Sequence, residues 1–456
     1  RKALTFRVPG YYWYSSYQSG RWDGNYSFLN LYRMTFPSGL LDILPQKLRD
    51  RVVLVDARQP PKDISWATPP ELHGIKLRDY QQEMIEEAVR RSRCVMQSPT
   101  NAGKTEIAAG VIKTLGVKTL FLTHLENLLY QTQERLSLRL QEDVGIISAG
   151  RWEPKRVTVG MIPTLYMRIK VRDKRCADFL WEEVECLFLD EVHHLSSESW
   201  LHVSKRCNAY FRYGLSATPL MRDAISNLKL IGQTGGAVGG VTNVDLIERG
   251  ISAKPLVKVV SNRTIGVDLE RKSWQTAYRL GIETNLNRNS LIACIVDNAR
   301  HESKPVLILV NTVKHLISLY WELVERFGKE GAKRVVMLSG MTPGEDRMKH
   351  VKALSRRKLD VMIATPIFDE GMDMPEIRVL VLAGGGKSQI KLLQRVGRGM
   401  RRKETGENVV EVYDFLDIGN RYLEQHARRR IDVYRSQGFD VEVKEVEGEQ
   451  PLRGVL

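Results

Sequence analysis

The sequence predicts an α/β protein with two tandem parallel-sheet domains behind a small N-terminal α+β domain. Short, continuous apolar runs alternate with helical segments, as in parallel strands that are covered on both faces. The runs form two series along a chain of 456 residues, a length that suits about three domains. The first 65 residues are far richer in aromatic side chains than the rest.

Ten strand-like runs carry the two predicted sheets. The first series is Cys94–Gln97, Thr119–Leu122, Val157–Met161, Cys186–Leu189 and Tyr213–Leu215. The second series is Val306–Val310, Val335–Leu338, Val361–Ile363, Val379–Leu382 and Val409–Tyr413. A proline-containing linker is expected between residues 59 and 70, and a second boundary near Gly250–Pro255. We therefore predict domains at residues 1–65, 66–252 and 253–456.

Composition narrows the class of protein. No apolar run approaches the roughly 20 residues that cross a bilayer, and the basic start lacks a signal-peptide core. Five scattered cysteines argue against a disulfide framework or a zinc site and fit a reducing cytoplasm. The net charge of +15 favours a polyanionic partner, although many basic proteins have none. We expect a soluble cytoplasmic protein that does not bind membranes.

A phosphate-binding loop follows the first strand run and precedes a helix predicted over Glu106–Leu115. Backbone N–H groups of such a loop approach nucleotide phosphates at the positive end of the helix. The loop consists of Ser98, Pro99, Thr100, Asn101, Ala102, Gly103, Lys104 and Thr105. We expect Lys104 to hold the β- and γ-phosphates of ATP and Thr105 to ligate Mg²⁺. Ser98 stands where the pattern has glycine, which leaves the phosphate contacts intact.

Two carboxylates follow the apolar run Cys186–Leu189, at the strand edge where open α/β sheets bind ligands. We expect Asp190 to hold Mg²⁺ and Glu191 to accept a proton from the attacking water. Incidental surface acids are the alternative, which the upstream phosphate-binding loop makes weak.

These motifs belong to an ordered series over roughly residues 75–415 that resembles the superfamily 2 helicases. The resemblance implies two RecA-like domains with ATP bound between them. Gln81 lies in a segment that resembles the adenine-sensing Q motif, and Gly371 and Asp373 lie in a segment that resembles motif V. The remaining matches are Thr123 and His124 in motif Ia, Asp190–His193 in motif II, Ser216–Thr218 in motif III and Gln394–Arg401 in motif VI.

The resemblance also implies how such a motor works. Arg398 and Arg401 would reach the γ-phosphoryl group as arginine fingers, so that ATP binding favours closure of the two domains. Hydrolysis would be coupled to strand binding through His193, Ser216, Thr218 and Gln394. The alternative for such arginines is a solvated basic helix face, and we favour solvation or phosphate contact for Arg402 and Lys403.

Nucleic-acid contacts are expected on loops of the same sheets, where hydroxyl and N–H groups hold the phosphate backbone. Binding would then be sequence-independent and salt-sensitive. For each threonine the alternative is an ordinary turn or cap. The expected contacts are Thr123, His124, Gly160, Thr164, Asn311, Thr312 and Thr365.

The motif details resemble the DNA-repair branch of the superfamily, which includes XPB-type and phage UvsW-type helicases. Motif II reads Asp-Glu-Val-His, Pro219 follows motif III, and Asn285 precedes Arg288-Asn289. The segments 21–24 and 36–40 resemble the small N-terminal domain of the UvsW type. The resemblance implies ATP-dependent branch migration on forks, Holliday junctions and D-loops, with 3′–5′ polarity, in recombination, repair and replication. It also implies that the protein is a monomer whose partners are single-stranded and branched DNA. A T5-like phage would encode it, and it would act in the cytoplasm of the host bacterium.

Other functions remain open at this point. A duplex DNA translocase without strand separation would fit the motor motifs, although no nuclease or methyltransferase domain is attached. An RNA helicase fits motif II less well, and a non-catalytic clamp would need a broken ATP site. Glu442 and Lys444 match half of a nuclease signature, but we interpret Phe439–Val446 as an edge strand. Arg428–Arg430 in a C-terminal helix would either touch phosphate or be solvated.

Eleven of the 35 aromatic residues lie between Phe6 and Phe36. A domain of about 65 residues needs such rings for its own core, and we favour that interpretation. The alternative is that rings among arginines and lysines stack on unpaired bases. Replacing Trp13 or Tyr14 by alanine distinguishes these interpretations, because only a core ring would contribute much to the melting temperature.

Overall fold

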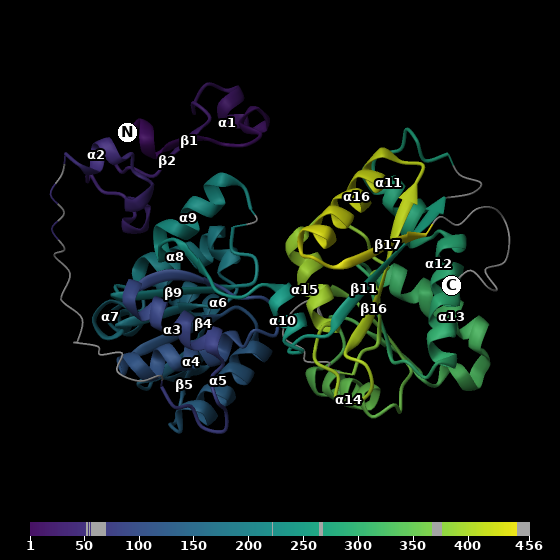
Figure 1. Ribbon diagram of the computed structural model, residues 1–456. Helices are drawn as coiled ribbons and strands as arrows, with labels where there is room; N and C mark the ends of the chain where they lie inside the picture. Colours follow the sequence, from purple (N-terminus) through teal and green to yellow (C-terminus); the bar gives the residue numbers. More distant parts are fainter. Residues whose placement is uncertain are drawn as a thin grey trace. The chain divides into compact units, whose positions relative to one another are not determined.

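The computed structural model describes residues 1–51, 53, 55, 70–220, 222–263, 268–366 and 376–444, in two compact units, Arg1–Val241 and Thr242–Leu456 (Figure 1). Residues 56–69, which contain most of the predicted linker, lie outside the described part, as do Gly371 and Asp373 of motif V. Within that part, no helix is long and apolar enough to cross a membrane.

An N-terminal α+β segment begins unit 1. It pairs β1 (Thr5–Arg7) with β2 (Asn25–Ser27) in an antiparallel ladder. Its helical turns are η1 (Lys2–Leu4), η2 (Tyr11–Trp13), α1 (Ser15–Gln18), η3 (Ser38–Ile43) and α2 (Gln46–Arg49).

The segment shares its small core with the rest of unit 1. Leu4, Phe28 and Leu40 are buried together with Ile225 of α9 (Ala224–Thr234). At Gly39 an added Cβ would lie 2.0 Å from the Ile231 carbonyl oxygen, so η3 and α9 pack backbone to backbone. This contact ties the segment to the sheet domain of its own unit.

The large sheet of unit 1 has the strand order β10-β3-β9-β8-β4-β7-β5-β6, in which only the β5–β6 pairing is antiparallel. The strands are β3 (Arg93–Gln97), β4 (Thr119–Thr123), β5 (Gly145–Ser148), β6 (Arg151–Glu153), β7 (Val157–Met161), β8 (Cys186–Leu189), β9 (Phe211–Ser216) and β10 (Ala237–Gly239). The five predicted runs of the first series are therefore strands, as expected.

Helices cover both faces of this sheet (Figure 1). They are α3 (Asp79–Arg91), α4 (Lys104–Leu115), α5 (Glu126–Leu140), α6 (Ile162–Lys170), α7 (Lys174–Asp178), η4 (Phe179–Glu183), η5 (Val192–Ser196), α8 (Glu198–Arg206) and α9. Strand β4 shows why its run is continuously apolar. Phe121 packs into one core cluster, whereas Leu120 and Leu122 pack into another.

Unit 2 carries a seven-stranded sheet of order β13-β14-β12-β15-β16-β11-β17, in which every pairing is parallel. The strands are β11 (Lys254–Arg263), β12 (Val306–Leu309), β13 (Val335–Leu338), β14 (Val361–Ala364), β15 (Val379–Val381), β16 (Val409–Ile418) and β17 (Asp440–Lys444). The helices are α10 (Asn243–Glu248), α11 (Trp274–Tyr278), η6 (Arg279–Glu283), α12 (Leu286–His301), α13 (Val313–Ala332), α14 (Gly344–Ser355), α15 (Gln389–Gly399) and α16 (Arg421–Ser436).

The last two strands at one end of this sheet, β11 and β17, test what the sequence predicted there. Strand β17 lies at the sheet edge beside β11, so the prediction of an edge strand at Glu442–Lys444 is confirmed. Strand β11 was not predicted, since Pro255 and two lysines interrupt its apolar pattern. Pairing with β16 along ten residues nevertheless makes it a strand.

Candidate functional site

The predicted phosphate-binding loop connects β3 to α4. Gly103, the N-cap of α4, has φ 82° and ψ 48°, a left-handed conformation that glycine adopts without steric cost. An added Cβ would lie 2.4 Å from Nε2 of Gln81, so this position also lacks room for a larger residue. The loop therefore delivers Lys104 and Thr105 to the first turn of a 12-residue helix.

Helix α3 holds the loop in place through two side chains. Gln81 donates from Nε2 to the Ala102 carbonyl oxygen at 2.9 Å, and the Tyr80 hydroxyl donates to the same oxygen at 3.1 Å. Gln81 Oε1 accepts from the Arg78 backbone N–H at 3.0 Å. Gln81 thus has a role in supporting the loop that its expected contact with adenine did not suggest.

Lys104 links the loop to motif II. Its Nζ lies 2.9 Å from Oε1 of Glu191, and both side chains are mostly buried. Burial raises the pKa of Glu191, but the nearby Lys104 ammonium and the His193 hydrogen bond outweigh it, so the pKa falls below the ordinary value. Burial and the Glu191 charge raise the pKa of Asp190 to about 6. The structure therefore holds Glu191 ionised, ready to accept a hydrogen bond.

Motifs II and III meet at His193. Its Nδ1 lies 3.3 Å from Oε2 of Glu191 and 3.2 Å from Oγ of Ser216, and the His193 ring is buried. The Thr218 backbone N–H donates to the same Ser216 hydroxyl at 3.1 Å. Three of the four residues predicted to couple hydrolysis to strand binding, His193, Ser216 and Thr218, are therefore in one hydrogen-bonded chain that ends at Glu191.

A histidine that sequence analysis did not single out extends this chain toward motif Ia. The ring of His194 lies 4.3 Å from that of His193 and 4.8 Å from that of His124, between ring centroids. Trp200 of α8 lies 6.1 Å from His194. The second histidine of the Asp-Glu-Val-His-His sequence was the available signal, since it directly follows motif II.

The residues at this sheet edge fit a magnesium nucleotide. The Thr105 hydroxyl and the Asp190 carboxylate are oxygen donors of the kind that Mg²⁺ prefers. Ser98 Oγ, at the start of the loop, is buried and has no hydrogen-bond partner among the described residues. The helix N-terminus, Lys104 and the left-handed Gly103 supply the phosphate-facing groups. Such an ion would neutralise phosphate charge during hydrolysis.

The nucleic-acid contacts predicted for unit 1 differ in accessibility. Thr123 is fully buried, with its hydroxyl 3.8 Å from Sδ of Met161. Gly160 lies inside β7, where an added Cβ would come within 3.2 Å of Leu120 and Leu122. His124 and Thr164 are half-buried. Packing inside the domain thus explains why Thr123 and Gly160 occupy their positions. His124 and Thr164 remain the more accessible of the predicted contacts.

In unit 2 the predicted contacts make structural bonds. Asn311 donates to the Gly384 carbonyl at 2.7 Å and accepts from Arg395 at 2.9 Å. Thr312 caps α13 by accepting from the His315 N–H, as the alternative for such threonines anticipated. Thr365 is buried at the end of β14. Their predicted contacts with nucleic acid remain predictions.

A basic pocket that was not predicted lies beside Asn311. It encloses about 290 Å³, and its lining includes Lys387, Ser388, Lys391 and Arg395. Lys387 and Lys391 are exposed, and Ser388 caps α15. The sequence signal was the run Gly384-Gly385-Gly386-Lys387-Ser388 between a strand and a helix, which is short and lacks the full phosphate-loop pattern.

Motif VI occupies α15 and the turn after it. Arg398 and Gln394 are half-buried on the helix, and Arg401 forms a β-bridge with Ser252. Arg402 is exposed, as expected. For Lys403 the expectation of a solvated side chain or phosphate contact is wrong.

Lys403 is 5% exposed and donates to the Gly399 carbonyl at 2.8 Å. Burial is the main cause that lowers its pKa to about 7. Asn408 completes this anchor, accepting from the Lys403 backbone N–H and donating to the Ser252 carbonyl, each at 3.0 Å. The turn that carries Arg401 is therefore bonded to the start of β11.

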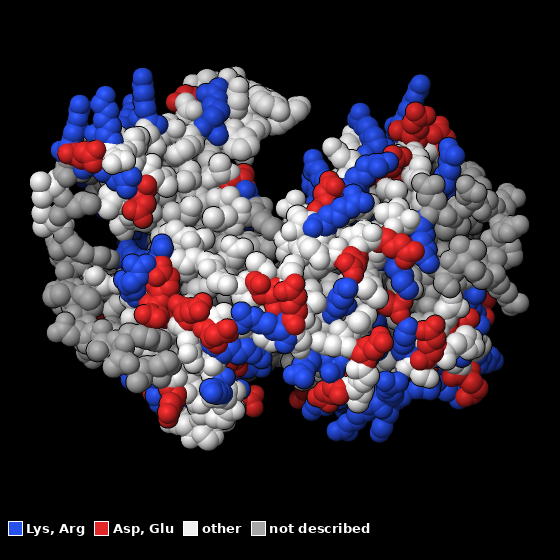
Figure 2. Space-filling view, viewed as in Figure 1, with Lys and Arg blue, Asp and Glu red and all other residues white. Residues whose placement is uncertain are grey.

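The three consecutive arginines of α16 also divide into exposed and buried side chains. Arg428 and Arg429 are exposed. Arg430 is buried, with Nε 2.8 Å from Oδ2 of Asp414, so the alternative of a solvated side chain is wrong. It lines the pocket beside Asn311, and its contact with phosphate stays a prediction. Lysine and arginine side chains gather over α14, α16 and the N-terminal segment beside α2 (Figure 2).

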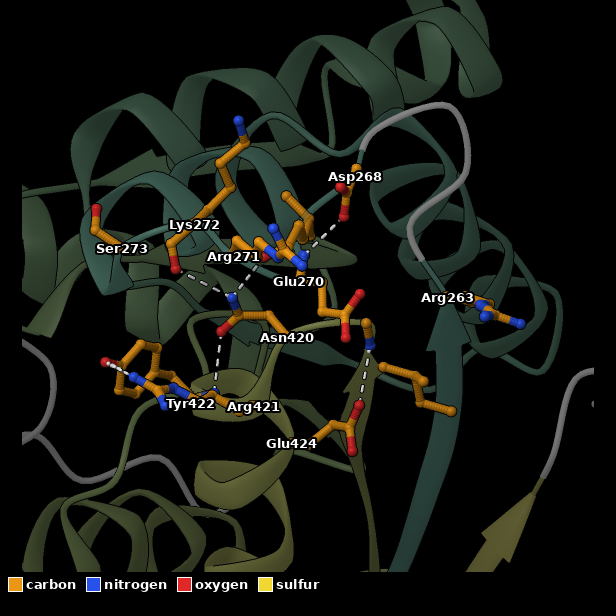
Figure 3. A pocket seen from close by; sticks show the side chains of 13 residues that line it. Arg263, Asp268, Glu270, Arg271, Lys272, Ser273, Asn420, Arg421, Tyr422 and Glu424 are labelled. Carbon is orange, nitrogen blue, oxygen red and sulfur yellow. Dashed lines mark hydrogen bonds between the residues drawn. The ribbon is translucent and has the colours of Figure 1, made fainter.

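A larger cavity of about 1090 Å³ lies at the carboxyl ends of β11 and β16, apart from the motif residues (Figure 3). Asn420 donates to the Leu269 carbonyl at 2.7 Å and fixes its wall. Arginines and carboxylates alternate around it, including Arg263, Glu270 and Glu424. Its mixed charge selects no one ligand, and its lining contains none of the predicted site residues.

Two protein families match the regions that contain these residues. Residues 74–221 match the family described as Type III restriction enzyme, res subunit, and residues 287–403 match the Helicase conserved C-terminal domain. Together the two regions hold the phosphate-binding loop, motifs II and III, and motif VI. The chain belongs to the superfamily 2 helicases. As a member, it is an ATP-dependent enzyme.

Similar proteins span most of this helicase. It is 25% identical to the DNA 3'-5' translocase XPB2 of Sulfurisphaera tokodaii, over 74% of this chain and 81% of that protein. It is 23% identical to the ATP-dependent DNA helicase uvsW of Enterobacteria phage T4, over 98% of this chain and 95% of that protein. The restriction-modification enzyme LlaBIII bound to DNA shares the fold, with a TM-score of 0.62 and 14% identity. That alignment covers 83% of this chain and 32% of the enzyme.

Proposed function

We propose that this helicase uses ATP and Mg²⁺ to move along DNA and to migrate branches at forks and four-way junctions, with 3′–5′ polarity. The observation that carries the proposal is the chain of contacts from Lys104 through Glu191 and His193 to Ser216. It unites a phosphate ligand, a general base and the coupling residues of a motor in one unit. The names of the two similar proteins support DNA as the track.

Each residue of the site has a proposed task. Lys104 binds the β- and γ-phosphates, and Thr105 and Asp190 hold the metal ion. Glu191, kept ionised by Lys104 and His193, accepts a proton from water. Arg398 and Arg401 of motif VI stabilise charge on the γ-phosphoryl group. His193, Ser216 and Thr218 pass the state of the site to the strand-binding loops.

Unit 2 is proposed to hold the DNA backbone at its basic pocket. Lys387 and Lys391 are exposed cations at the rim, and the Ser388 hydroxyl lies between them in sequence. Such groups bind phosphate without reading bases. Contacts of this kind let a motor advance along any sequence, and they weaken as salt rises.

Branched DNA is proposed as the substrate because the likeness to the uvsW helicase includes the N-terminal segment of this chain, with 98% of the chain aligned. A motor core alone would need no such segment. The second candidate function is translocation on duplex DNA without strand separation, which the match of residues 74–221 to a restriction-enzyme subunit favours.

ATP hydrolysis and strand displacement test the proposal together. Hydrolysis would be measured without nucleic acid and with single-stranded DNA, duplex, a four-way junction and RNA, with Lys104→Ala as the blank. We expect DNA to stimulate hydrolysis, most strongly as the junction, and the labelled junction to be resolved into forks. Stimulation by duplex without displacement would favour the second candidate, and stimulation by RNA alone would contradict both.

A further inference from the structure

The N-terminal segment presents three aromatic rings to solvent at one turn. Trp13 is 76% exposed, and its neighbours Tyr12 and Tyr14 are each 52% exposed. They lie on and beside η2, and the rings of Tyr12 and Trp13 are 5.2 Å apart. The expectation that rings of this segment form its core holds for Phe6 and Phe28 but fails for these three.

The turn is held rigidly from below. The Tyr11 ring packs edge-on against Tyr17 at 4.7 Å, and the Arg7 guanidinium lies 3.8 Å above its centroid. Gly24 fits against it so closely that an added Cβ would lie 2.9 Å from the Tyr11 ring. Arg7 also donates to the Asp23 carbonyl at 2.6 Å. These contacts fix the backbone that carries Tyr12 and Trp13.

The Tyr14 ring, the third exposed ring of this turn, is also held by contacts within the segment. Tyr14 packs edge-on against Trp22 at 5.6 Å, and the Trp22 indole N–H donates to the Asn25 carbonyl at 2.8 Å. The Gln18 side chain donates to the Tyr12 carbonyl at 3.0 Å. Folding therefore orders the backbone of the turn and the Tyr14 ring, which lowers the conformational entropy that a stacked ligand would cost.

The charge of the segment that carries the turn points to a polyanion. Residues 1–51 contain eight lysines and arginines against three aspartates and no glutamate. Exposed aromatic rings in a positive field are what single-stranded nucleic acids bind, since bases stack on the rings while phosphates meet the cations. An apolar protein partner that met these exposed rings would gain nothing from this excess of positive charge.

We propose that Tyr12, Trp13 and Tyr14 form a stacking platform for unpaired bases at the branch point of DNA. The inference rests on the proposed function and adds the element that recognises the branch. Trp13, as the most exposed of the three rings, stacks on the first unpaired base beyond a duplex end. Blunt duplex offers no unpaired base, so the platform discriminates in favour of forks and other branched DNA that carries unpaired bases.

Binding of labelled DNA by full-length Trp13→Ala tests the platform. We expect about a tenfold weaker affinity for a fork with unpaired arms and less than a twofold change for blunt duplex of equal length. Trp13→Phe should recover most of the loss, because it restores a ring. The salt dependence of binding should stay the same, since no phosphate contact is removed.

The matched control is Trp321→Ala on α13 of unit 2, a tryptophan that is 63% exposed. It should leave fork binding unchanged. Equal losses on fork and blunt duplex, or no loss on either, would overturn the platform, and the second result would leave a protein partner as its occupant. If Trp13→Ala lowers the melting temperature, tryptophan fluorescence replaces the binding comparison with that variant. The signal of Trp13 is then the fluorescence of the wild type minus that of Trp13→Phe. Quenching of that difference signal by an unpaired fork, and not by duplex, is expected, and absence of quenching sinks the proposal.

Failure of the platform is distinguishable from failure of the proposed function. Wild-type hydrolysis that responds to DNA, together with an unaffected Trp13→Ala variant, removes only the platform. Wild-type hydrolysis that ignores every DNA removes the motor function itself.

Discussion

The Lys104 ammonium lies 2.9 Å from Oε1 of Glu191, across 87 residues of sequence. The proposed phosphate ligand and the proposed general base of the site are therefore direct neighbours. Because nucleotide phosphates compete with the carboxylate for the same ammonium, nucleotide binding is expected to change the hydrogen bonding of Glu191. We therefore expect the phosphate-binding loop and motif II to respond to ATP as one unit.

Replacing Lys104 and replacing Glu191 should have different consequences. Lys104→Ala should weaken ATP binding at least tenfold, because it removes the phosphate ligand, and abolish hydrolysis. Glu191→Gln should keep ATP binding and slow hydrolysis roughly 10²–10⁴-fold, because it removes only the base. Binding of a fluorescent ATP analogue and release of phosphate measure the two effects. Near wild-type hydrolysis by Glu191→Gln would exclude Glu191 as the base.

His194 should matter for coupling, because its ring joins His193 to His124 at centroid distances of 4.3 and 4.8 Å. We expect His194→Ala to lower the ratio of DNA-stimulated to unstimulated hydrolysis several-fold. His202→Ala on α8, whose ring contacts Tyr166 instead, is the matched control. If both variants keep the wild-type ratio, the histidine cluster has only a packing role.

A buried ion pair should control the stability of unit 2. Arg288, whose side chain is 0% exposed, lies 2.8 Å from Oδ1 of Asp417, whose side chain is 3% exposed. Asp417→Ala leaves a buried guanidinium without its partner and should cost about 3–5 kcal/mol of unfolding free energy.

The matched control for this pair is Asp440→Ala, which removes an exposed ion pair with Lys254 and should cost at most about 1 kcal/mol. Calorimetric melting of both variants compares the two losses. Equal losses would show that burial contributes nothing to the pair.

Acid should destabilise unit 2 through His315. Burial and the charge of Arg288 lower its pKa to about 3, and Nε2 lies 3.1 Å from Oδ1 of Asn289, which places the proton on Nε2. The unfolded chain takes up a proton near pH 6.5, so the contribution of His315 to stability is full above that pH. It is lost progressively as the pH falls from about 6.5 toward 3.

His315→Gln keeps a donor for Asn289 but cannot titrate. Its melting temperature should therefore fall less than that of the wild type between pH 6.5 and 5, where His315 accounts for about 2 kcal/mol. Thermal melts at half-unit pH steps provide the comparison. Parallel pH profiles would mean that His315 is protonated in the folded protein.

Sequence alone predicted the ten apolar strands of the two sheets, which the structure confirms, and named the residues expected to form the ATP site. Apolar runs such as Thr119–Leu122 were predicted correctly, because a strand that is buried on both faces is apolar at every position. This pattern is visible without knowing which strands pair with it. The prediction of Lys104 followed from the loop that precedes α4, and the predictions of Asp190 and Glu191 followed from their position at the end of a strand run.

Tertiary structure alone decided which polar side chains are buried and what they contact. The sequence around Lys403 and Arg430 suggests solvated side chains. In the fold both are buried, because Lys403 donates to the Gly399 carbonyl and Arg430 pairs with Asp414. Trp13 looks like a core residue, yet the small core closes around Phe28 and leaves it outside. Burial depends on partners that are distant in sequence, and no local pattern encodes which partners the packed chain brings together.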